Sequence, residues 1–237
     1  MTELLYLRDH YLREFEAQVE KAEGDSVVLD KTAFYPTGGG QPNDLGKISW
    51  EGGEAQVIDV SKKAGAVFHK LEGTMPQLSA TVHGTIDWQR RYVFMRYHSA
   101  LHVLCGLVYH RYGGLVTGGQ IYSEKARMDF DLQDINPERV KEIEKECNKA
   151  IQDSRPITVG FLTREEAMKH PDLIRTKINL LPADIAEVRV VEIEGLDVQA
   201  DGGTHVSNTK EIQGIKVIRT DNKGRINRRM EINLSTP

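Results

Sequence analysis

The hydrophobic pattern of this 237-residue chain changes its period at Asp87. Before that residue, short alternating or β-branched runs recur between turn residues. After it, apolar residues recur at helical spacing as far as Gly113-Gly114, with Asp87 as a suitable N-cap and the glycines as a suitable helix end. The sequence therefore predicts a boundary at this point, with a β-domain at 1–86 and a second domain at 87–237.

The first domain is predicted to be a small β-barrel, with a sandwich of the same strands as the alternative. Turn residues separate its six strand-like runs, which are Ser26–Leu29, Thr32–Tyr35, Lys47–Trp50, Ala55–Val60, Ala66–Leu71 and Ala80–Ile86.

The densest turn signal of the chain runs from Thr37 to Gly46 and contains Gly38, Gly39 and Gly40. It lacks the Gly-Lys-Ser/Thr of a phosphate loop, so we expect no nucleotide cofactor. The segment is either a structural turn or a loop whose bare backbone approaches a substrate or a neighbouring domain closely.

The second domain is predicted to be α+β, with an antiparallel sheet packed by two longer helices. One helix follows Asp87, and the other is Pro137–Asp153 with Asn136 as its N-cap. A short helix is expected at Arg164–His170. The predicted strands are Leu115–Ile121, Ala126–Phe130, Ile157–Leu162, Glu187–Ile193, Gly214–Thr220 and Ile226–Leu234.

Two histidines of the long helix, His98 and His102, are four residues apart, which places their Cβ atoms roughly 5–6 Å apart on one face. Cys105 and Tyr109 share this sector beside an apolar stripe, so the imidazoles face inward. Inward imidazoles need partners, and either hydrogen bonds or a metal ion would satisfy them. A distant segment, Asp201-Gly-Gly-Thr-His205, can provide further ligands.

The overall net charge of −4 gives no general sign of a nucleic-acid partner, so any such contact depends on local basic residues. These are either a solvated face or phosphate contacts. One group is Arg90, Arg91 and Arg96. The other, after His205, consists of Lys210, Lys216, Arg219, Lys223, Arg225, Arg228 and Arg229.

Two cysteines, Cys105 and Cys147, are too few for a disulfide framework and fit a reducing compartment. No stretch reaches the roughly 18 apolar residues of a membrane span, so we expect no membrane contact. The expected location is the cytoplasm. Nothing in the sequence indicates the oligomeric state.

A series of motifs resembles, in the same order, the editing domain of alanyl-tRNA synthetases: His98-Ser-Ala-Leu-His102, Ala126-Arg-Met-Asp-Phe130, Val188-Arg-Val-Val191, Asp201-Gly-Gly-Thr-His-Val206 and Arg228-Arg229. Gly38-Gly-Gly-Gln-Pro42 and Asp44-Leu-Gly46 precede them. With these, nearly the whole chain resembles the freestanding alanyl-tRNA editing proteins, the AlaX family.

The resemblance implies a hydrolase that acts in trans, without ATP, on the aminoacyl ester of mischarged tRNA(Ala). Serine is the main amino acid expected to be removed, and glycine is left open. The cofactor implied is one zinc ion per chain. Two readings from other classes remain: a catalytically inactive tRNA-binding module of the same fold, and a zinc esterase for small molecules.

By the same resemblance, the zinc ligands are His98, His102 and His205, and Asp201 stands where the family has cysteine. Zinc accepts carboxylate oxygen at about 2.0–2.2 Å in place of thiolate at about 2.3 Å. Asp201 is therefore either a ligand or a residue that orients an imidazole N–H or a water molecule. Cys105 is a less suitable ligand, because it lies about 10.5 Å along the helix axis from His98.

The same resemblance also implies which residues contact the substrate. Polar side chains are needed to pair with the hydroxyl of serine, and Ser99, Gln120 and Thr204 are the nearest candidates by motif. We expect the Gly38-Gly39-Gly40 loop to approach the substrate, and Arg228 and Arg229 to contact tRNA phosphates.

Overall fold

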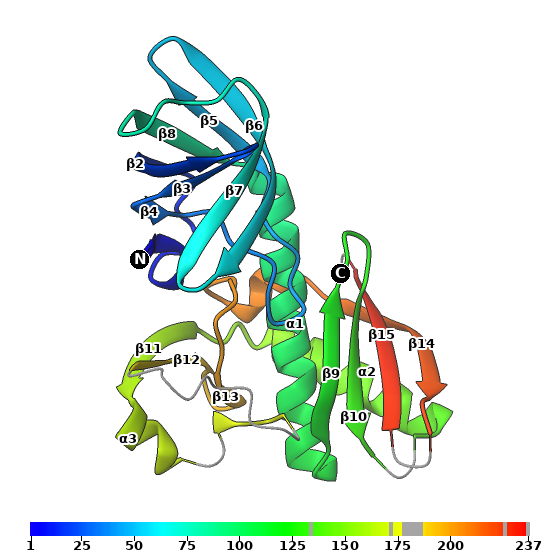
Figure 1. Cartoon of the computed structure of the whole chain (residues 1–237). Helices are drawn as coiled ribbons and strands as arrows, with labels where there is room; N and C mark the ends of the chain where they lie inside the picture. The colour runs from blue at the N-terminus through cyan, green and yellow to red at the C-terminus, as the bar shows by residue number, and fades with distance from the viewer. Residues whose placement is uncertain (133–134, 171–172, 177–186, 225–226, 236–237) are drawn as a thin grey trace. The chain divides into compact units, whose positions relative to one another are not determined.

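The computed structural model of the chain describes residues 1–132, 135–170, 173–176, 187–224 and 227–235. The chain divides into two compact units, Met1–Phe94 and Met95–Pro237. A closed barrel forms the first unit, and antiparallel sheets with helices form the second (Figure 1). The predicted α+β fold with an N-terminal small barrel is therefore confirmed.

Six antiparallel strands close the barrel in the order β2-β3-β7-β6-β5-β8 (Figure 1). Alternate residues point inward and fill it, among them Val27, Leu29, Ile48 and Val67, whose side chains are completely buried. The strand bounds are β2 (Glu14–Glu23), β3 (Ser26–Leu29), β5 (Gly46–Trp50), β6 (Gly53–Lys63), β7 (Ala66–Gly73) and β8 (Thr81–Ile86).

Two details of the barrel unit differ from the predicted runs. Strand β2 is not among the predicted runs, although Phe15, Ala17 and Val19 alternate inward along it, because the outward residues include Glu14, Glu16 and Glu20, which have low strand propensity. The predicted strand Thr32–Tyr35 is only the short β4 (Lys31–Thr32), which pairs in parallel with β1 (Glu3–Leu4) ahead of the 3-10 helix η1 (Leu5–Leu7). Beyond Thr32 the backbone N–H of Tyr35 donates to the carboxylate of Asp44 instead of to a strand.

A buried ion pair fixes the glycine-rich segment to the start of helix α1 (Trp88–Tyr112). The Arg91 side chain is fully buried, and its Nε lies 2.9 Å from both carboxylate oxygens of Asp44. Its two Nη groups donate to the backbone carbonyls of His10 and Ala33. Arg91 is therefore a structural residue of the first unit, and the expectation that it belongs to an exposed basic cluster is wrong.

Helix α1 begins and ends where the sequence predicts. The Asp87 carboxylate accepts from the backbone N–H of Arg90 at 3.1 Å, as an N-cap does. Gly113 ends the helix with a φ of 67°, in the left-handed region that favours glycine. The helix begins in the first unit and continues into the second, where it carries the two histidines.

The described residues of the second unit form two antiparallel sheets, where the sequence predicts one (Figure 1). The larger has the order β14-β15-β10-β9, and the smaller has the order β11-β12-β13. Helix α2 packs against β14 of the larger sheet. The bounds are β9 (Leu115–Ile121), β10 (Ala126–Asp131), β11 (Ile157–Thr163), β12 (Glu187–Ile193), β13 (Asp197–Ala200), β14 (Ile215–Asn222) and β15 (Asn227–Leu234).

Among the helices described in this unit are α2 (Pro137–Gln152), α3 (Arg164–Met168) and the 3-10 helix η3 (Thr209–Ile212). The Asn136 side chain accepts from the N–H of Arg139, so the predicted cap of α2 is confirmed. Strand β13 was not predicted, because four residues directly after a turn at Gly195 give too short a pattern. Ile226, the first residue of the last predicted strand, lies outside the described residues.

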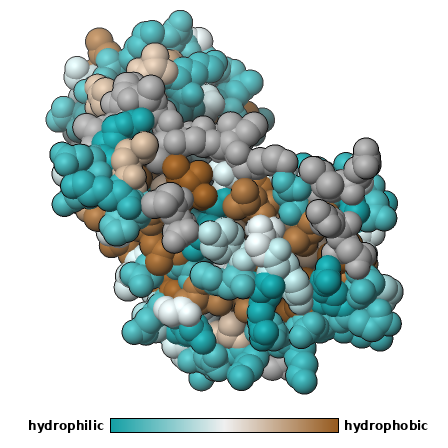
Figure 2. Space-filling model, turned by 90° about the horizontal axis from the view of Figure 1, so that it is seen from below, coloured by the Kyte–Doolittle hydropathy of each residue, from teal (hydrophilic) through white to brown (hydrophobic). Residues whose placement is uncertain are grey.

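Hydrophilic residues predominate on the face of the molecule drawn in Figure 2. Large exposed hydrophobic residues in the described part of the chain come from well-separated positions in the sequence: Met1, Ile58, Leu78, Tyr122, Met168 and Ile218. Within the same described ranges, none of the helices has the length and apolar character needed to cross a membrane.

Candidate metal centre

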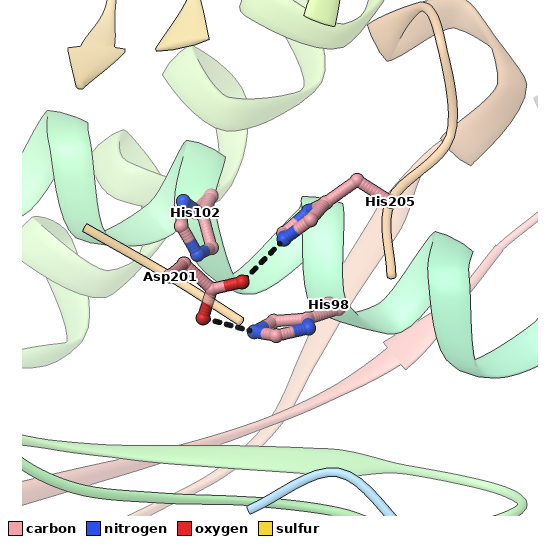
Figure 3. Close-up of side chains that lie close together, drawn as sticks. All are labelled: His98, His102, Asp201 and His205. Carbon is pink, nitrogen blue, oxygen red and sulfur yellow. Dashed lines mark hydrogen bonds and ion pairs between the residues drawn. The ribbon is translucent and has the colours of Figure 1, made fainter. Parts of the chain in front are cut away.

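Helix α1 places His98 and His102 one turn apart with their rings facing the interior of the second unit (Figure 3). Both residues are buried, at 6 % and 5 % exposure, and their ring centroids are 5.2 Å apart. The predicted inward orientation follows from the buried apolar neighbours Tyr97, Leu101 and Leu104, which hold this side of the helix in the core.

The segment after β13 brings Asp201 and His205 to the same point (Figure 3). Asp201 is fixed to β12, because its N–H donates to the carbonyl of Arg189 at 3.2 Å and its own carbonyl accepts from Arg189 Nη1 at 2.6 Å. The next turn is held by the N–H of Gly203, which donates to Asp201 Oδ2 at 2.6 Å. The His205 ring then lies 4.3 Å from that of His98 and 4.6 Å from that of His102, between centroids.

Together these four side chains form a compact set of metal ligands. Each offers one nitrogen or oxygen atom, and these atoms lie within 4.8 Å of one another. Asp201 Oδ2 is 3.1 Å from His205 Nε2, and Asp201 Oδ1 is 3.5 Å from His98 Nε2. Adjacent ligand atoms of a tetrahedral zinc ion are roughly 3.3 Å apart, given bonds of about 2.0–2.2 Å. Three imidazoles and a carboxylate at these separations fit such an ion.

Burial sets the protonation of two of the imidazoles. It lowers the pKa of His98 to about 4, and burial with the nearby His98 holds the pKa of His205 well below its usual value. Both rings are neutral at pH 7, which is the form that binds a metal. Burial acts the other way on Asp201, but His98 and the hydrogen bond from His205 hold the pKa of this carboxyl well below its ordinary value.

Ser99 supports the centre from the next position of α1. Its Oγ lies 3.2 Å from His205 Nδ1 and accepts from the backbone N–H of Val206 at 3.1 Å. Ser99 therefore ties the helix to the His205 segment and faces the ring nitrogen opposite to the one beside Asp201. The hydroxyl is completely buried within this local network.

Three other predicted or considered site residues of the second unit are not members of the ligand set. Thr204 is completely buried between Asp201 and His205 in the chain. Gln120 lies on β9, where its Nε2 donates to the carbonyl of Ile121, and no hydrogen bond in the described ranges joins it to the four ligand candidates. Cys105 is buried and its pKa is raised by burial and by the charge of Asp197; among the described residues it is not part of the ligand set.

Arg228 and Arg229 both make contacts in or directly beside their own sheet. Arg229 forms a bidentate ion pair with Asp129 of β10, with two distances of 2.7 Å. Arg228 donates to the backbone carbonyls of Gly224 and Asn227. Their predicted role in binding tRNA stays a prediction.

The glycine loop belongs to the first unit. Gly39 and Gly40 have φ values of 57° and 81°, so they serve the turn conformation. Gly38 has neither a positive φ nor a crowded position: a Cβ there would meet only Tyr35 Oη at 3.7 Å and a backbone oxygen at 3.9 Å. Gly38 is the loop position at which the fold itself does not require glycine.

One buried group beside the centre was not predicted. The Asp197 side chain, at the start of β13, has an oxygen 3.2 Å from His102 Nδ1. The only sign in the sequence is a carboxylate four residues before Asp201, which by itself does not distinguish this aspartate from any other.

Two family models match the chain. The model for class II (A) tRNA synthetases matches residues 4–90, and the model for the second additional domain of threonyl and alanyl tRNA synthetases matches residues 188–231. The barrel unit and the unit with the ligand cluster are thus each related to parts of tRNA synthetases.

Relatives match over almost the full length. An alanyl-tRNA editing protein AlaX-M from Methanosarcina acetivorans is 43% identical over 99% of both chains, and one from Saccharolobus solfataricus is 43% identical over 97% of this chain and 98% of its own. The alanine–tRNA ligase of Thermococcus kodakarensis is 39% identical over 93% of this chain but only 24% of the ligase. The chain belongs to the AlaX family of alanyl-tRNA editing proteins, as its motifs predict.

Proposed function

We propose that this protein hydrolyses the aminoacyl ester of mischarged tRNA(Ala), releasing serine and sparing alanine. The observation that carries the proposal is the buried cluster of His98, His102, Asp201 and His205 in a chain similar throughout its length to proteins named for alanyl-tRNA editing. The substrate is already an activated ester, so its hydrolysis requires a positioned water molecule and stabilisation of negative charge on the carbonyl oxygen.

The four residues of the cluster are proposed to hold one zinc ion. When bound, zinc supplies Lewis acidity, which polarises an ester carbonyl or makes water a stronger acid. The donor set supports this assignment, because imidazole suits zinc and a carboxylate replaces the thiolate of the family pattern at little change in bond length.

The residues around the cluster have separate proposed tasks. Ser99 holds the His205 ring from its far nitrogen, which keeps Nε2 directed at Asp201. Arg189 and Gly203 hold the backbone and carboxylate of Asp201. These contacts fix the ligand atoms before a substrate arrives, and such preorganisation lowers the reorganisation needed during the reaction.

Selection against alanine requires polar groups that pair with the serine hydroxyl and are left without a partner by alanine. Ser99 already contacts His205 and Val206, so we assign this task first to Gln120, and Thr204 stays a candidate by its place in the motif. The Gln120 amide nitrogen is used by Ile121, but its carbonyl oxygen accepts no hydrogen bond within the described residues. That oxygen is suited to accept one from a serine hydroxyl.

Release of serine from Ser-tRNA(Ala) tests the proposal when it is compared between zinc-loaded and chelator-treated protein. We expect release only with zinc, and no comparable turnover of seryl esters that lack tRNA. Equal turnover of the simple esters would instead favour a small-molecule esterase. Binding of tRNA without release would favour an inactive binding module, the reading that Asp201 in place of cysteine keeps open.

A further inference from the structure

We infer that Asp197 is a positioning residue for His102: it accepts the Nδ1 proton and so directs the other ring nitrogen, Nε2, into the metal centre. This inference rests on the metal centre of the proposed function. The Asp197 side chain is completely buried, and its Oδ2 lies 3.2 Å from His102 Nδ1. In Figure 3, one ring nitrogen of His102 points toward Asp201.

The tautomer of His102 follows from its two neighbours. Gln199 Nε2 is 3.4 Å from His102 Nδ1, but the same amide donates to Asp197 Oδ2 at 2.6 Å. The Gln199 amide nitrogen can only donate, whereas a carboxylate oxygen is a strong acceptor for an imidazole N–H. Nδ1 therefore carries the proton, and Nε2 presents its lone pair to the cluster.

The fold brings this carboxylate unusually close to the helix. Gly106 follows His102 by one turn of α1, and a Cβ at Gly106 would lie 2.8 Å from the carbonyl oxygen of Leu196 and 2.9 Å from Asp197 Cβ. Only glycine allows the β12–β13 turn to approach at this point. One turn further along, His110 Nε2 contacts the same carbonyl of Leu196 at 3.0 Å. Helix α1 and the turn that carries Asp197 thus pack as one piece.

Asp197 has a second neighbour, Arg175, and pairing with it is the competing explanation for a buried carboxylate. Arg175 Nε is 3.6 Å from Asp197 Oδ1, and its guanidinium lies over the Tyr109 ring at 3.8 Å. However, Asp197 Oδ1 accepts no hydrogen bond in the described part of the chain, whereas Oδ2 faces both Gln199 and His102. The closest contacts of the carboxylate are on the side of the metal centre.

The tautomer can be measured without any substitution. Long-range proton–nitrogen NMR of the metal-free protein, with imidazole signals assigned by single histidine replacements, should show His102 protonated on Nδ1. Loading with zinc should leave that proton in place and shift the Nε2 resonance. A proton on Nε2 in the metal-free protein, or loss of the Nδ1 proton on loading, would overturn the inference.

Two variants separate the competing explanations. Asp197→Asn should weaken zinc binding about 10–100-fold in a chelator competition assay, as removal of a carboxylate behind a ligating histidine does. Arg175→Met breaks the same ion pair from the other side and should leave zinc affinity close to that of the unsubstituted protein. Equal losses in both variants, or no loss in Asp197→Asn, would overturn the inference. Absence of zinc binding in the unsubstituted protein would refute the metal centre itself.

Discussion

Replacing Asp201 by alanine should weaken zinc binding by roughly two to three orders of magnitude. Zinc bound by four protein ligands contributes about 10–16 kcal/mol at pH 7, or about 2.5–4 kcal/mol per ligand, and each 1.4 kcal/mol is tenfold in affinity. The carboxylate is placed for this role, because Oδ2 lies 3.1 Å from His205 Nε2 and Oδ1 lies 3.5 Å from His98 Nε2. Its loss removes both a donor atom and a neutralising charge.

The assay is competition for zinc against a chromophoric chelator, with Asp201→Cys as the matched variant. Cysteine restores the ligand that the family pattern has at this position, so it should keep zinc bound. Alanine also leaves the Gly203 N–H without its acceptor, which costs about 1 kcal/mol of stability, so unfolding is measured in excess chelator to separate the two effects. Unchanged zinc affinity in Asp201→Ala would refute the reasoning and place the carboxylate outside the ligand set.

Three further predictions concern the scaffold. Burial lowers the pKa of the His69 imidazole to about 4, so as the pH falls the unfolded chain binds a proton here before the folded protein does. The free energy of unfolding should therefore be highest above about pH 6.5 and fall by about 3 kcal/mol toward pH 4. Denaturant unfolding measured as a function of pH, with His69→Gln as the comparison, checks this. Gly106→Ala should lower both the unfolding midpoint and zinc affinity, because the new Cβ collides with the turn at Asp197; a rise in stability from better helix propensity would contradict this. Gly38→Ala should change the free energy of unfolding by less than about 0.5 kcal/mol, because the new Cβ has room, but it should slow deacylation. An unchanged deacylation rate would show that the loop is purely structural.

Much of the fold follows from local signals in the sequence. Helix α1 is bounded by Asp87 and Gly113, whose cap and left-handed conformation are chemical requirements of helix ends. The barrel follows from alternation, since the same residues that alternate in the sequence fill its interior. Strand β2 is not among the predicted runs because most of its outward positions are glutamates, and tertiary pairing with β3 and β8 overrides their low strand propensity.

The site likewise contains residues that local sequence patterns predict and residues that they do not. His98 and His102 share a helix face, so their proximity is fixed by helix geometry alone, and the motif around His205 identifies their partners. Asp197 and Arg91 could not be placed, because each acts through contacts between segments distant in the sequence. Asp197 reaches His102 only because Gly106 admits the turn, and Arg91 is buried only because Asp44 lies opposite. Neither pairing leaves a local pattern.

The central claim is that this cluster removes serine from tRNA(Ala) and spares alanine. Its most direct test is the single-turnover rate of amino-acid release from Ser-tRNA(Ala) and from Ala-tRNA(Ala), measured with zinc-loaded protein in excess over the same tRNA. We expect serine to be released much faster than alanine, and salt to weaken tRNA binding steeply while changing the rate at saturating protein less. Equal rates of serine and alanine release would show that the cluster does not edit tRNA(Ala).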